Sequence, residues 1–389
     1  MNQVYVFGSP STVLYGAGCI EKVGERLAKY GLKRALIVTD DTLVKTGKVG
    51  LLRRILASSL IDSYIYSGVN TETTNIHVAE GLAVMRQNSC DVVIALGGGS
   101  SIDAAKGIAI LATNPGDITD YEGRNIKIPN QRAMLVAIGT TAGTGSEVTR
   151  AAVVTDVKRN VKMVIKDEMI RPDMAVCDPL LTVSMPPSVT AATGMDALAH
   201  AIEGSVSRET QPMSEMFGLA AIKLISHSLP RAWANGQDIA ARSDMMLAEL
   251  LAGFAFGISA TCSGHGLARP FGAHFHVLHG MCNAFFLPVF MEFTIPACPE
   301  RFAKMAEAMG ENTAGMTVLE AGMKAVESVR RLQKTIRIPT LLEYGIDVEQ
   351  YRKSIPQMVK DGIASGSHRL NPRVPTEREL EKLYESLLN

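Results

Sequence analysis

Runs of β-branched and other apolar residues are concentrated in the first half of this chain, up to about residue 178. The four clearest runs are ALIVT (35–39), SYIY (63–66), VVIAL (92–96) and MLVAI (134–138). Segments with helical periodicity, such as 51–58 and 76–87, lie between them, and strands that alternate with helices are typical of a parallel sheet covered by helices. We therefore predict an α/β domain with a parallel sheet. Two further runs, 152–155 and 162–165, either complete this sheet or form a hairpin beside it.

The character of the sequence changes after Asp178. The stretch DPLLTVSMPPS contains three prolines, and beyond it Ala, Leu, Met and Glu dominate a pattern with helical periodicity. The length of 389 residues also exceeds the ~250 to 300 residues at which one hydrophobic core stops growing. We therefore predict an α/β domain over residues 1–185 and an all-helical domain over residues 186–389. A ligand site is expected in the cleft between them.

Composition argues for a small-molecule ligand. The 39 basic and 39 acidic residues balance, so nothing in the net charge favours a nucleic-acid or anionic-membrane partner. The first ten residues lack the pattern of a signal peptide, and no apolar run approaches the ~18 residues of a membrane span. Six scattered cysteines without a CxxC pair suit reduced thiols. We expect a cytoplasmic protein with neither a nucleic-acid nor a membrane partner.

A glycine-rich turn follows the apolar run at 92–96. Gly97, Gly98 and Gly99 lead through Ser100 into a segment with helical character, SIDAAKG. Glycines let a backbone approach a phosphate closely, and the N–H groups at a helix start stabilise its charge. The turn is not GxGxxG, and the alternative is a tight turn capped by Ser100 or Ser101.

A second polar loop, GTTAGTGSEVT (139–149), follows the run at 134–138. On its own it is equally compatible with a simple Thr- and Gly-rich loop. Two such loops after successive strands lie along one edge of a parallel sheet, where the ligands of doubly wound folds bind. Together the two loops predict a dinucleotide site.

Asp40 directly follows the run at 35–39. A carboxylate there accepts hydrogen bonds from an adenosine ribose and repels a 2′-phosphate, which favours NAD over NADP. The alternative is that Asp40 and Asp41 cap the next helix.

Histidines and one aspartate form a candidate metal site in the second half. Asp196 and His200 are spaced i and i+4 in AATGMDALAHAIEG (191–204), so both side chains project from one face of a helix. The same spacing is also typical of an ordinary hydrogen bond or salt bridge within a helix. The segment 264–280, GHGLARPFGAHFHVLHG, contains four of the eight histidines, His265, His274, His276 and His279. A carboxylate with three imidazoles gives a mixed metal site with room for a substrate oxygen.

Four motifs, GGGSSIDAAKG, GTTAGTGSEVT, the Asp196/His200 helix and GAHFHVLHGMCNAFFLP, together resemble the iron-containing (group III) alcohol dehydrogenase family. The resemblance spans nearly the whole chain. It implies an N-terminal dinucleotide-binding domain, a C-terminal helical domain that holds the metal, and an active site between them. It also implies an NAD- and iron-dependent enzyme, with zinc as the other candidate metal, that interconverts a short primary alcohol and its aldehyde. Family members are commonly dimers or larger, so a homodimer or a larger homo-oligomer is expected.

The resemblance assigns roles to individual residues. The implied metal ligands are Asp196, His200, His265 and His279, with His274 and His276 as neighbours only. The implied cofactor contacts are Asp40, Asn70, Gly98, Gly99, Ser100, Asp103, Thr140, Thr141, Thr144, Lys162 and Leu181. For Lys162, a plain solvated lysine is the alternative.

Two positions depart from the family pattern. Residues 70–73 read NTET where members commonly read NPT, which puts the contact at Asn70 in doubt. Arg269 stands where many members carry a second histidine credited with proton relay, and an arginine cannot take a proton at physiological pH. Arg269 follows His265 by one helical turn, so we hypothesise that it clamps the sulfonate, phosphonate or carboxylate of a short aldehyde such as sulfoacetaldehyde. It can equally pair with a cofactor phosphate or a structural carboxylate.

Three alternatives to this function stay open. A lactaldehyde, propanediol or simple alkanol oxidoreductase shares the chemistry and differs in the substrate. A zinc enzyme of the glycerol dehydrogenase or dehydroquinate synthase type shares the fold, but it usually has fewer protein ligands to the metal. A non-catalytic NAD-binding protein would have no turnover at all.

Overall fold

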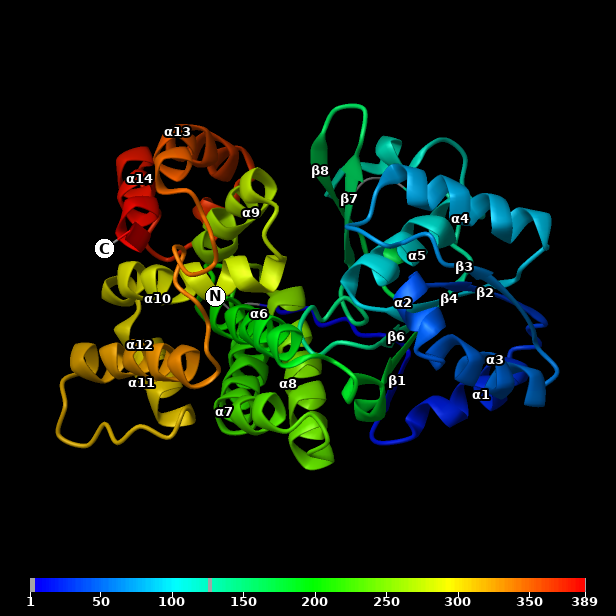
Figure 1. Cartoon of the computed structure of the whole chain (residues 1–389), viewed down its shortest axis with the longest axis horizontal. Coiled ribbons are helices and arrows are strands. Elements are labelled where there is room, and N and C mark those ends of the chain that lie inside the picture. Colours follow the sequence, from blue (N-terminus) through cyan, green and yellow to red (C-terminus); the bar gives the residue numbers. More distant parts are fainter. Residues whose placement is uncertain (1–3, 125–127, 389) are drawn as a thin grey trace. The chain divides into compact units, whose positions relative to one another are not determined.

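The computed structural model describes residues 4–124 and 128–388 (Figure 1). The chain divides into two compact units. The first, called here the sheet unit, is Gly8–Val183. The second, the helical unit, is Ser184–Asn389 together with the N-terminal segment that ends at Phe7. The predicted fold class, an α/β part with a parallel sheet followed by a helical part, is confirmed.

A six-stranded sheet with the strand order β1-β9-β6-β4-β2-β3 forms the centre of the sheet unit. All five strand pairs are parallel. The strands are β1 (Thr12–Tyr15), β2 (Arg34–Val38), β3 (Asp62–Tyr66), β4 (Val92–Gly97), β6 (Met134–Gly139) and β9 (Met174–Cys177). Four of them coincide with the predicted runs, whereas β1 and β9 have only four residues each and were not predicted.

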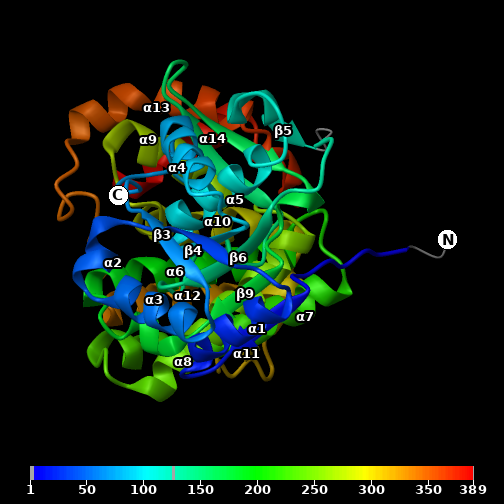
Figure 2. The same ribbon diagram turned by 90° about the vertical axis from the view of Figure 1, so that its right-hand side faces the viewer.

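Helices cover both faces of this sheet, because alternate residues of each strand point to opposite faces. Leu36 and Val38 of β2 belong to a core shared with α4 and α5, and Ala35 and Ile37 belong to a core shared with α1 and α3. Figure 2 shows α4 and α5 on one side of the strands and α1 and α3 on the other. The helices are α1 (Val23–Lys29), α2 (Asp41–Lys45), α3 (Lys48–Ser58), α4 (Asn75–Gln87) and α5 (Gly99–Leu111).

The two runs whose place the sequence left open form a hairpin outside the main sheet. Strands β7 (Ala151–Asp156) and β8 (Val161–Lys166) pair antiparallel, and β8 also pairs with the short β5 (Gly123–Arg124). These three strands are a separate sheet with the order β5-β8-β7.

The helical unit contains nine α-helices in the part that the structure describes. They are α6 (Pro187–Val206), α7 (Pro212–Ala234), α8 (Ile239–Ile258), α9 (Ser263–Phe275), α10 (His279–Thr294), α11 (Pro299–Ala308), α12 (Val318–Thr335), α13 (Val348–Ala364) and α14 (Glu377–Glu385). α6 is the central one, because it packs against α7, α8 and α10 and is buried along most of its length. A helix that is enclosed on several sides is expected to carry mostly apolar or small residues, as AATGMDALAHAIEG does apart from Asp196, His200 and Glu203.

Helix α10 is also largely enclosed. Among the described residues, His279–Ala297 is the one straight helical segment long and apolar enough to cross a membrane, and 72% of it is buried inside the protein. α8 and α9 pass the same test only as a pair bent by 105°. A core helix of a helical domain has this composition, and α10 contributes to the side-chain cluster described next.

Candidate functional site

Helix α6 places three acidic or imidazole side chains on one face. Asp196, His200 and Glu203 follow each other at intervals of four and three residues, which is one helical turn each time. All three are buried, with 3%, 5% and 0% of their surface exposed. A buried carboxylate without a partner is costly, so this face requires polar partners from the neighbouring helices.

Two histidines from other helices meet this face. His265 lies on α9 and His279 is the first residue of α10. The Oδ1 atom of Asp196 lies 3.9 Å from His265 Nε2 and 3.7 Å from His279 Nε2. The ligand atoms of these three residues all lie within 4.8 Å of one another. His200 completes the group, because its Nε2 is 3.0 Å from His265 Nε2. The structure therefore brings the four predicted metal ligands together.

Two glycines allow the helices to come this close. A Cβ atom on Gly280 would lie 2.3 Å from the backbone oxygen of Ala192 in α6. A Cβ on Gly264 of α9 would lie 2.6 Å from Glu203 Oε1. Neither contact is tolerable, so glycine at both positions is what lets α10 and α9 approach α6.

The two histidines are held in the neutral form. Burial lowers the pKa of His265 well below its usual value, and the nearby His200 and Arg269 lower it further. Burial also lowers the pKa of His279 to about 3, although Asp196 acts in the opposite direction. Metal binding requires imidazole with a free lone pair, so neutral histidines suit a ligand role.

Two residues that the sequence reasoning missed hold this group in place. Glu203 Oε1 lies 2.5 Å from His265 Nδ1 and accepts a hydrogen bond from the backbone N–H of His265 at 3.1 Å. Its other oxygen accepts from the backbone N–H of Cys262. A proton on His265 Nδ1, donated to Glu203, leaves the Nε2 lone pair facing the group. Burial raises the pKa of Glu203 to about 7, against the effect of these hydrogen bonds.

The second missed residue is Asn283, one helical turn after His279 on α10. Its amide nitrogen Nδ2 lies 2.6 Å from Asp196 Oδ1, 3.1 Å from His265 Nε2 and 3.2 Å from His279 Nε2. Spacing was the available signal for both missed residues, because Glu203 is seven residues after Asp196 and Asn283 is four after His279.

Arg269 lies one turn after His265 on α9, which is helical as the clamp hypothesis requires. Its Nη1 donates to Ser367 Oγ at 3.4 Å and its Nη2 to Thr261 Oγ1 at 3.3 Å. Its charge lowers the pKa of both His265 and His279, which places the guanidinium within electrostatic range of the group.

The other two histidines of this segment have different surroundings. His274 Nε2 lies 3.1 Å from Asp361 on α13, and the pair is partly exposed. His276 is exposed and ends α9 in the left-handed conformation, with φ of 53°. Neither belongs to the group of four.

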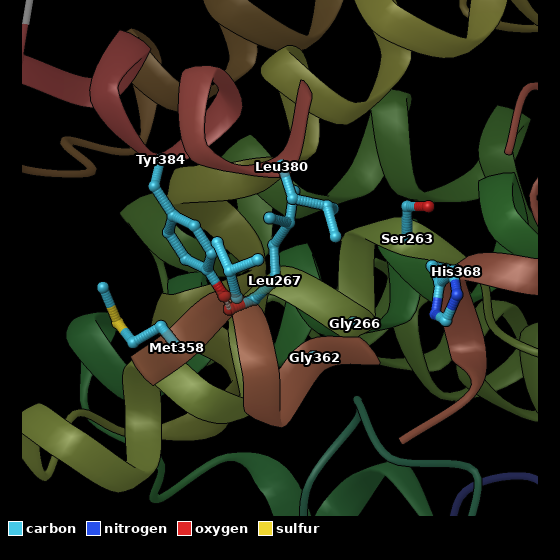
Figure 3. Close-up of a pocket in the computed structure, with 9 residues that line it drawn as sticks. Ser263, Gly266, Leu267, Met358, Gly362, His368, Leu380 and Tyr384 are labelled. Atoms are coloured by element: carbon cyan, nitrogen blue, oxygen red, sulfur yellow. Dashed lines mark hydrogen bonds between the residues drawn. The ribbon is translucent and has the colours of Figure 1, made fainter. Parts of the chain in front are cut away.

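The far side of α9 is fixed by apolar packing. Figure 3 shows a small crevice where Leu267 of α9, Met358 of α13 and Leu380 of α14 meet. The hydroxyl of Tyr384 donates to the backbone oxygen of Leu267 at 2.9 Å. Gly362 of α13 allows close packing, because a Cβ there would lie 3.0 Å from the backbone oxygen of Gly266. This packing sets the rotation of α9 that points His265 toward α6.

In the sheet unit, the two polar loops lie side by side. They leave β4 and β6 at paired positions, Gly97 opposite Gly139, and the N–H of Thr140 donates to the backbone oxygen of Gly97 at 3.0 Å. A Cβ on Gly98 would lie 3.5 Å from the Thr141 side chain, and one on Gly99 would lie 3.1 Å from that of Thr144.

The start of helix α5 has no side-chain cap among the described residues. Gly98 is its N-cap, and neither Ser100 nor Ser101 caps it, so the capped tight turn considered from the sequence is not what forms. Uncapped N–H groups at a helix start, next to glycines, are available to an anion.

A buried network holds the second loop against α5. Asp103 accepts hydrogen bonds from Ser146 Oγ at 2.6 Å and from the Val153 N–H at 2.9 Å. Lys106, one turn further along α5 and fully buried, donates to Ser146 Oγ at 2.9 Å and to the backbone oxygen of Ala151 at 2.6 Å. Lys106 also reaches Thr149, and it was missed by the sequence reasoning although GGGSSIDAAKG contains it.

The remaining predicted cofactor residues lie at several places in the sheet unit. Asp40 is the N-cap of α2 and accepts from the Leu43 N–H at 2.9 Å, as the alternative interpretation of this residue expected. Asn70 is close to it, because its Oδ1 accepts from the Asp41 N–H at 3.0 Å.

Lys162 and Leu181 have other surroundings. Lys162 Nζ forms an ion pair of 2.7 Å with Glu72, a residue of the atypical NTET segment, and both side chains are partly exposed. Leu181 is buried in a short 3-10 helix, Pro179–Thr182.

Comparison with known proteins assigns the class. Residues 10–179 match the model of the iron-containing alcohol dehydrogenases, and residues 190–388 match the model of the C-terminal part of the Fe-containing alcohol dehydrogenase family. The chain belongs to the iron-containing alcohol dehydrogenase family. Members are oxidoreductases that act on the CH–OH group of alcohols, with NAD(H) and Fe²⁺ as cofactors.

Individual relatives cover nearly the whole chain. The NAD-dependent methanol dehydrogenase of Bacillus methanolicus is 38% identical over 98% of this chain and 99% of its own length. The crystal structure of a 1,3-propanediol oxidoreductase superposes with a TM-score of 0.96 at 37% identity, covering 99% of this chain and 100% of its own. Sulfoacetaldehyde reductase from Bifidobacterium kashiwanohense, in complex with NAD⁺, superposes with a TM-score of 0.89 at 28% identity and 99% coverage of both chains.

Proposed function

We propose that this protein is an NAD- and iron-dependent reductase of short aldehydes and the corresponding primary alcohol dehydrogenase. The observation that carries the proposal is the convergence of one carboxylate and three imidazoles from three helices, α6, α9 and α10. Two of the imidazoles are neutral, and each of the four residues has its ligand atom within 3.0 to 4.0 Å of another in the group.

The donor set fits a divalent transition metal. Carboxylate and imidazole are ligands that Fe²⁺ and Zn²⁺ share, and four protein ligands exceed the number usual in catalytic zinc sites. We assign Asp196, His200, His265 and His279 as the ligands. A bound ion there supplies a Lewis acid for an alcohol or carbonyl oxygen. Glu203 orients His265, and three of the four ligands are buried, whereas the His279 side chain is 39% exposed.

The two loops of the sheet unit fit a dinucleotide. The uncapped N–H groups at Gly99 and Ser100 suit its phosphates, and NAD supplies or accepts the hydride. We assign the cofactor contacts to Asp40, Asn70, Gly98, Gly99, Ser100, Asp103, Thr140, Thr141, Thr144, Lys162 and Leu181. Among these, Asp103 acts by holding the second loop, since both its oxygens already accept hydrogen bonds.

Arg269 favours an aldehyde with an anionic tail as the substrate. A guanidinium near the ligand group can bind a sulfonate, phosphonate or carboxylate through two parallel hydrogen bonds. Sulfoacetaldehyde is the compound we would test first, and the similarity to a sulfoacetaldehyde reductase supports this choice. Neutral substrates are the second candidate, because the relatives with higher identity include a methanol dehydrogenase and a 1,3-propanediol oxidoreductase.

The test of the reaction is anaerobic NADH oxidation by iron-reconstituted protein with a panel of neutral and anionic short aldehydes. We expect turnover that falls by more than about a thousandfold in Asp196→Ala, because metal-assisted steps contribute several kcal/mol to the barrier. The matched control is His276→Asn, an exposed histidine of the same segment, which should keep both metal and activity. Full activity in Asp196→Ala, or a zinc content with activity on diols only, would contradict the proposal.

Arg269→Gln tests the substrate class separately. If Arg269 clamps the substrate tail, kcat/KM for sulfoacetaldehyde should fall about a hundredfold or more while kcat/KM for propanal changes little, since a charge-assisted bidentate pair is lost only for the anion. Equal losses for both substrates would show that Arg269 supports the site in general, through a cofactor phosphate or a structural carboxylate.

The cellular setting belongs to the same proposal. We infer a cytoplasmic homodimer or larger homo-oligomer, with an NAD-binding domain over residues 1–185 and a metal-binding domain over 186–389. Light scattering on the purified protein tests the dimer, and expression of the two segments separately tests the boundary.

A further inference from the structure

The side chain of Arg269 is flanked by two buried hydroxyl groups. Its Nη1 donates to Ser367 Oγ at 3.4 Å and its Nη2 donates to Thr261 Oγ1 at 3.3 Å. The two hydroxyls come from different segments, because Thr261 precedes α9 and Ser367 begins the short 3-10 helix Ser367–Leu370. Thr261 is 9% exposed and Ser367 is 6% exposed. Two buried hydroxyls and one guanidinium of the helical unit therefore meet beside α9.

Each of these hydroxyls still has a hydrogen to donate. A hydroxyl that accepts a hydrogen bond from a guanidinium directs its own hydrogen away from that cation. Within residues 4–124 and 128–388, neither Thr261 Oγ1 nor Ser367 Oγ donates a hydrogen bond. A buried donor without an acceptor is costly. The two hydroxyls and the guanidinium are therefore a set of donors that suits an acceptor from outside the chain.

The local charge favours an anion as that acceptor. Arg269 lies one helical turn after the assigned ligand His265, and its charge lowers the pKa of His265 and Glu203. Arg269 and a divalent ion in the ligand group carry three positive charges together. Asp196 and Glu203 carry two negative charges when both are ionised. The net charge is then +1, so an anionic tail on the substrate neutralises it.

We propose that Arg269, Thr261 and Ser367 together bind the tail of the substrate, and that this tail is a tetrahedral oxoanion, a sulfonate or phosphonate. The inference rests on the proposed function and narrows its substrate class. The three oxygens of such a group point in three directions, so one can accept from the guanidinium and one from each hydroxyl. The two oxygens of a carboxylate lie in one plane with the fork of the guanidinium, which leaves the flanking hydroxyls poorly aligned.

The position of the donors also limits the length of the substrate. His265 and Arg269 are separated by one turn of α9, which is a rise of ~5.4 Å. A chain of two or three carbons spans this distance between a carbonyl oxygen at the ligand group and the tail. Thr261 and Ser367 are therefore specificity-determining residues for short aldehydes, and their role is to position the tail.

Two alcohols that differ only in the tail test the inference without turnover. They are 2-hydroxyethanesulfonate and 3-hydroxypropionate, which have the same charge and the same two-carbon chain. Isothermal titration calorimetry measures their dissociation constants for the full chain loaded with NADH, which cannot accept a hydride from an alcohol. Co²⁺ serves as the metal, because it binds to the same nitrogen and oxygen ligands as Fe²⁺ and is stable in air.

The variants remove one hydroxyl at a time. Thr261→Val and Ser367→Ala lose the hydroxyl with little change in volume, whereas Thr261→Ser keeps it. Ser263→Ala is the matched control, because Ser263 is a serine of α9 that is 1% exposed and its hydroxyl has no hydrogen-bond partner among the described residues (Figure 3). Circular dichroism and NADH binding verify that each variant is folded.

We expect the wild type to bind the sulfonate at least about tenfold more tightly than the carboxylate, because only the sulfonate satisfies both hydroxyls. Thr261→Val and Ser367→Ala should each weaken sulfonate binding about tenfold and carboxylate binding less than about threefold, since a hydrogen bond to a charged group is lost mainly for the sulfonate. Thr261→Ser and Ser263→Ala should bind the sulfonate as the wild type does.

Two results would overturn the inference. One is equal binding of the two alcohols by the wild type, and this comparison decides the question alone if the variants do not fold. The other is unchanged sulfonate binding in both Thr261→Val and Ser367→Ala. Turnover of neutral aldehydes by a protein that does not bind the sulfonate would overturn this inference and leave the proposed reaction in place. A wild type that binds neither NADH nor Co²⁺ would instead overturn the proposed function itself.

Discussion

The two candidate sites of this enzyme are built from different parts of the chain. The metal group of the helical unit consists of side chains that come from three helices and lie up to 83 residues apart in sequence, from Asp196 to His279. The nucleotide loops of the sheet unit consist largely of backbone N–H groups and small side chains, each loop directly after a strand. One site depends on how helices pack, and the other depends on where strands end.

This difference determines what supports each site. Glu203 and Asn283 contact the metal ligands directly and lie on the same helices, so their loss should be confined to metal binding. Lys106 lies beneath the loop that it supports and is part of the hydrophobic interior of the sheet unit. Replacement of Lys106 should therefore lower the stability of the sheet unit as well as weaken nucleotide binding.

Replacement of Lys106 should have the largest effect. Lys106→Met keeps most of the side-chain volume but removes the positive charge 3.7 Å from Asp103 and the hydrogen bond to the Ala151 oxygen. The free energy of unfolding of the sheet unit should fall by about 3 to 5 kcal/mol, as when one partner of a buried charge network is removed. Urea unfolding and NADH titration measure the effect, and Co²⁺ binding should not change. Lys29→Met, at an exposed ion pair with Glu25, is the control and should cost less than about 1 kcal/mol.

The difference in the free energy of unfolding between the wild type and Lys106→Met should depend on pH with a definite sign. Burial lowers the pKa of Lys106 from 10.5 to about 8. Between these two pH values the unfolded chain therefore holds a proton that the folded chain has lost, so the contribution of Lys106 to the free energy of unfolding rises with pH. The gap between wild type and Lys106→Met should widen from pH 8 to pH 10. A gap that narrows would mean that Lys106 stays charged in the folded protein.

Glu203→Gln should affect only the helical unit. Glutamine is close in size but cannot keep the carboxylate that fixes the His265 proton on Nδ1, and loss of such an orienting partner weakens metal binding by about 10- to 100-fold. Chelator competition with Co²⁺ measures the affinity. Glu292→Gln, which removes a partly exposed ion pair on α10, should leave it unchanged. If Glu203→Gln loses as much NADH affinity as Co²⁺ affinity, the expectation that Glu203 supports only the metal site would be wrong.

The sequence predicted the residues that recur at simple spacings. Asp196 and His200 one turn apart, and glycines directly after an apolar run, are local patterns whose geometry follows from one helix or one strand end. The four longer strands of the sheet were predicted for the same reason. The hairpin β7–β8 was considered from the sequence, but only the structure separates it from the main sheet.

The supporting residues could not be assigned from local pattern. Asn283 is 87 residues from Asp196, and Lys106 is 45 residues from Ala151. Which face of α10 meets α6 depends on close approaches such as that of Gly280 to Ala192, which periodicity does not reveal. β1 and β9 were not predicted, and their pairing with each other joins positions about 160 residues apart, which no local pattern reveals.

A methyl group in the first glycine loop tests the backbone nature of the nucleotide site. In Gly99→Ala the new Cβ would lie 3.1 Å from Thr144 Cγ2, so the two loops must separate slightly, and the methyl would stand at the first uncapped turn of α5. We expect NADH binding to weaken about tenfold, or roughly 1.4 kcal/mol, with Co²⁺ binding unchanged. Gly50→Ala in α3 is the matched control, because its Cβ meets only Arg54 at 3.8 Å and alanine favours a helix. If Gly99→Ala binds NADH as tightly as the wild type does, the NADH phosphates do not bind at this glycine loop.

The smallest effect is expected at Asp40, and it decides whether the Asp40 carboxylate contributes to nucleotide recognition. Asparagine caps a helix about as well as aspartate, so Asp40→Asn should keep the start of α2 and remove only the negative charge. We expect the preference for NADH over NADPH, measured as the ratio of kcat/KM values, to fall several-fold, because the 2′-phosphate is no longer repelled. Asp238→Asn, at the equivalent cap of α8 in the helical unit, controls for the loss of a capping charge and should leave the ratio unchanged. An unchanged ratio in Asp40→Asn would show that Asp40 is a cap alone, and the contrast between a site made of backbone and a site made of side chains would then become sharper.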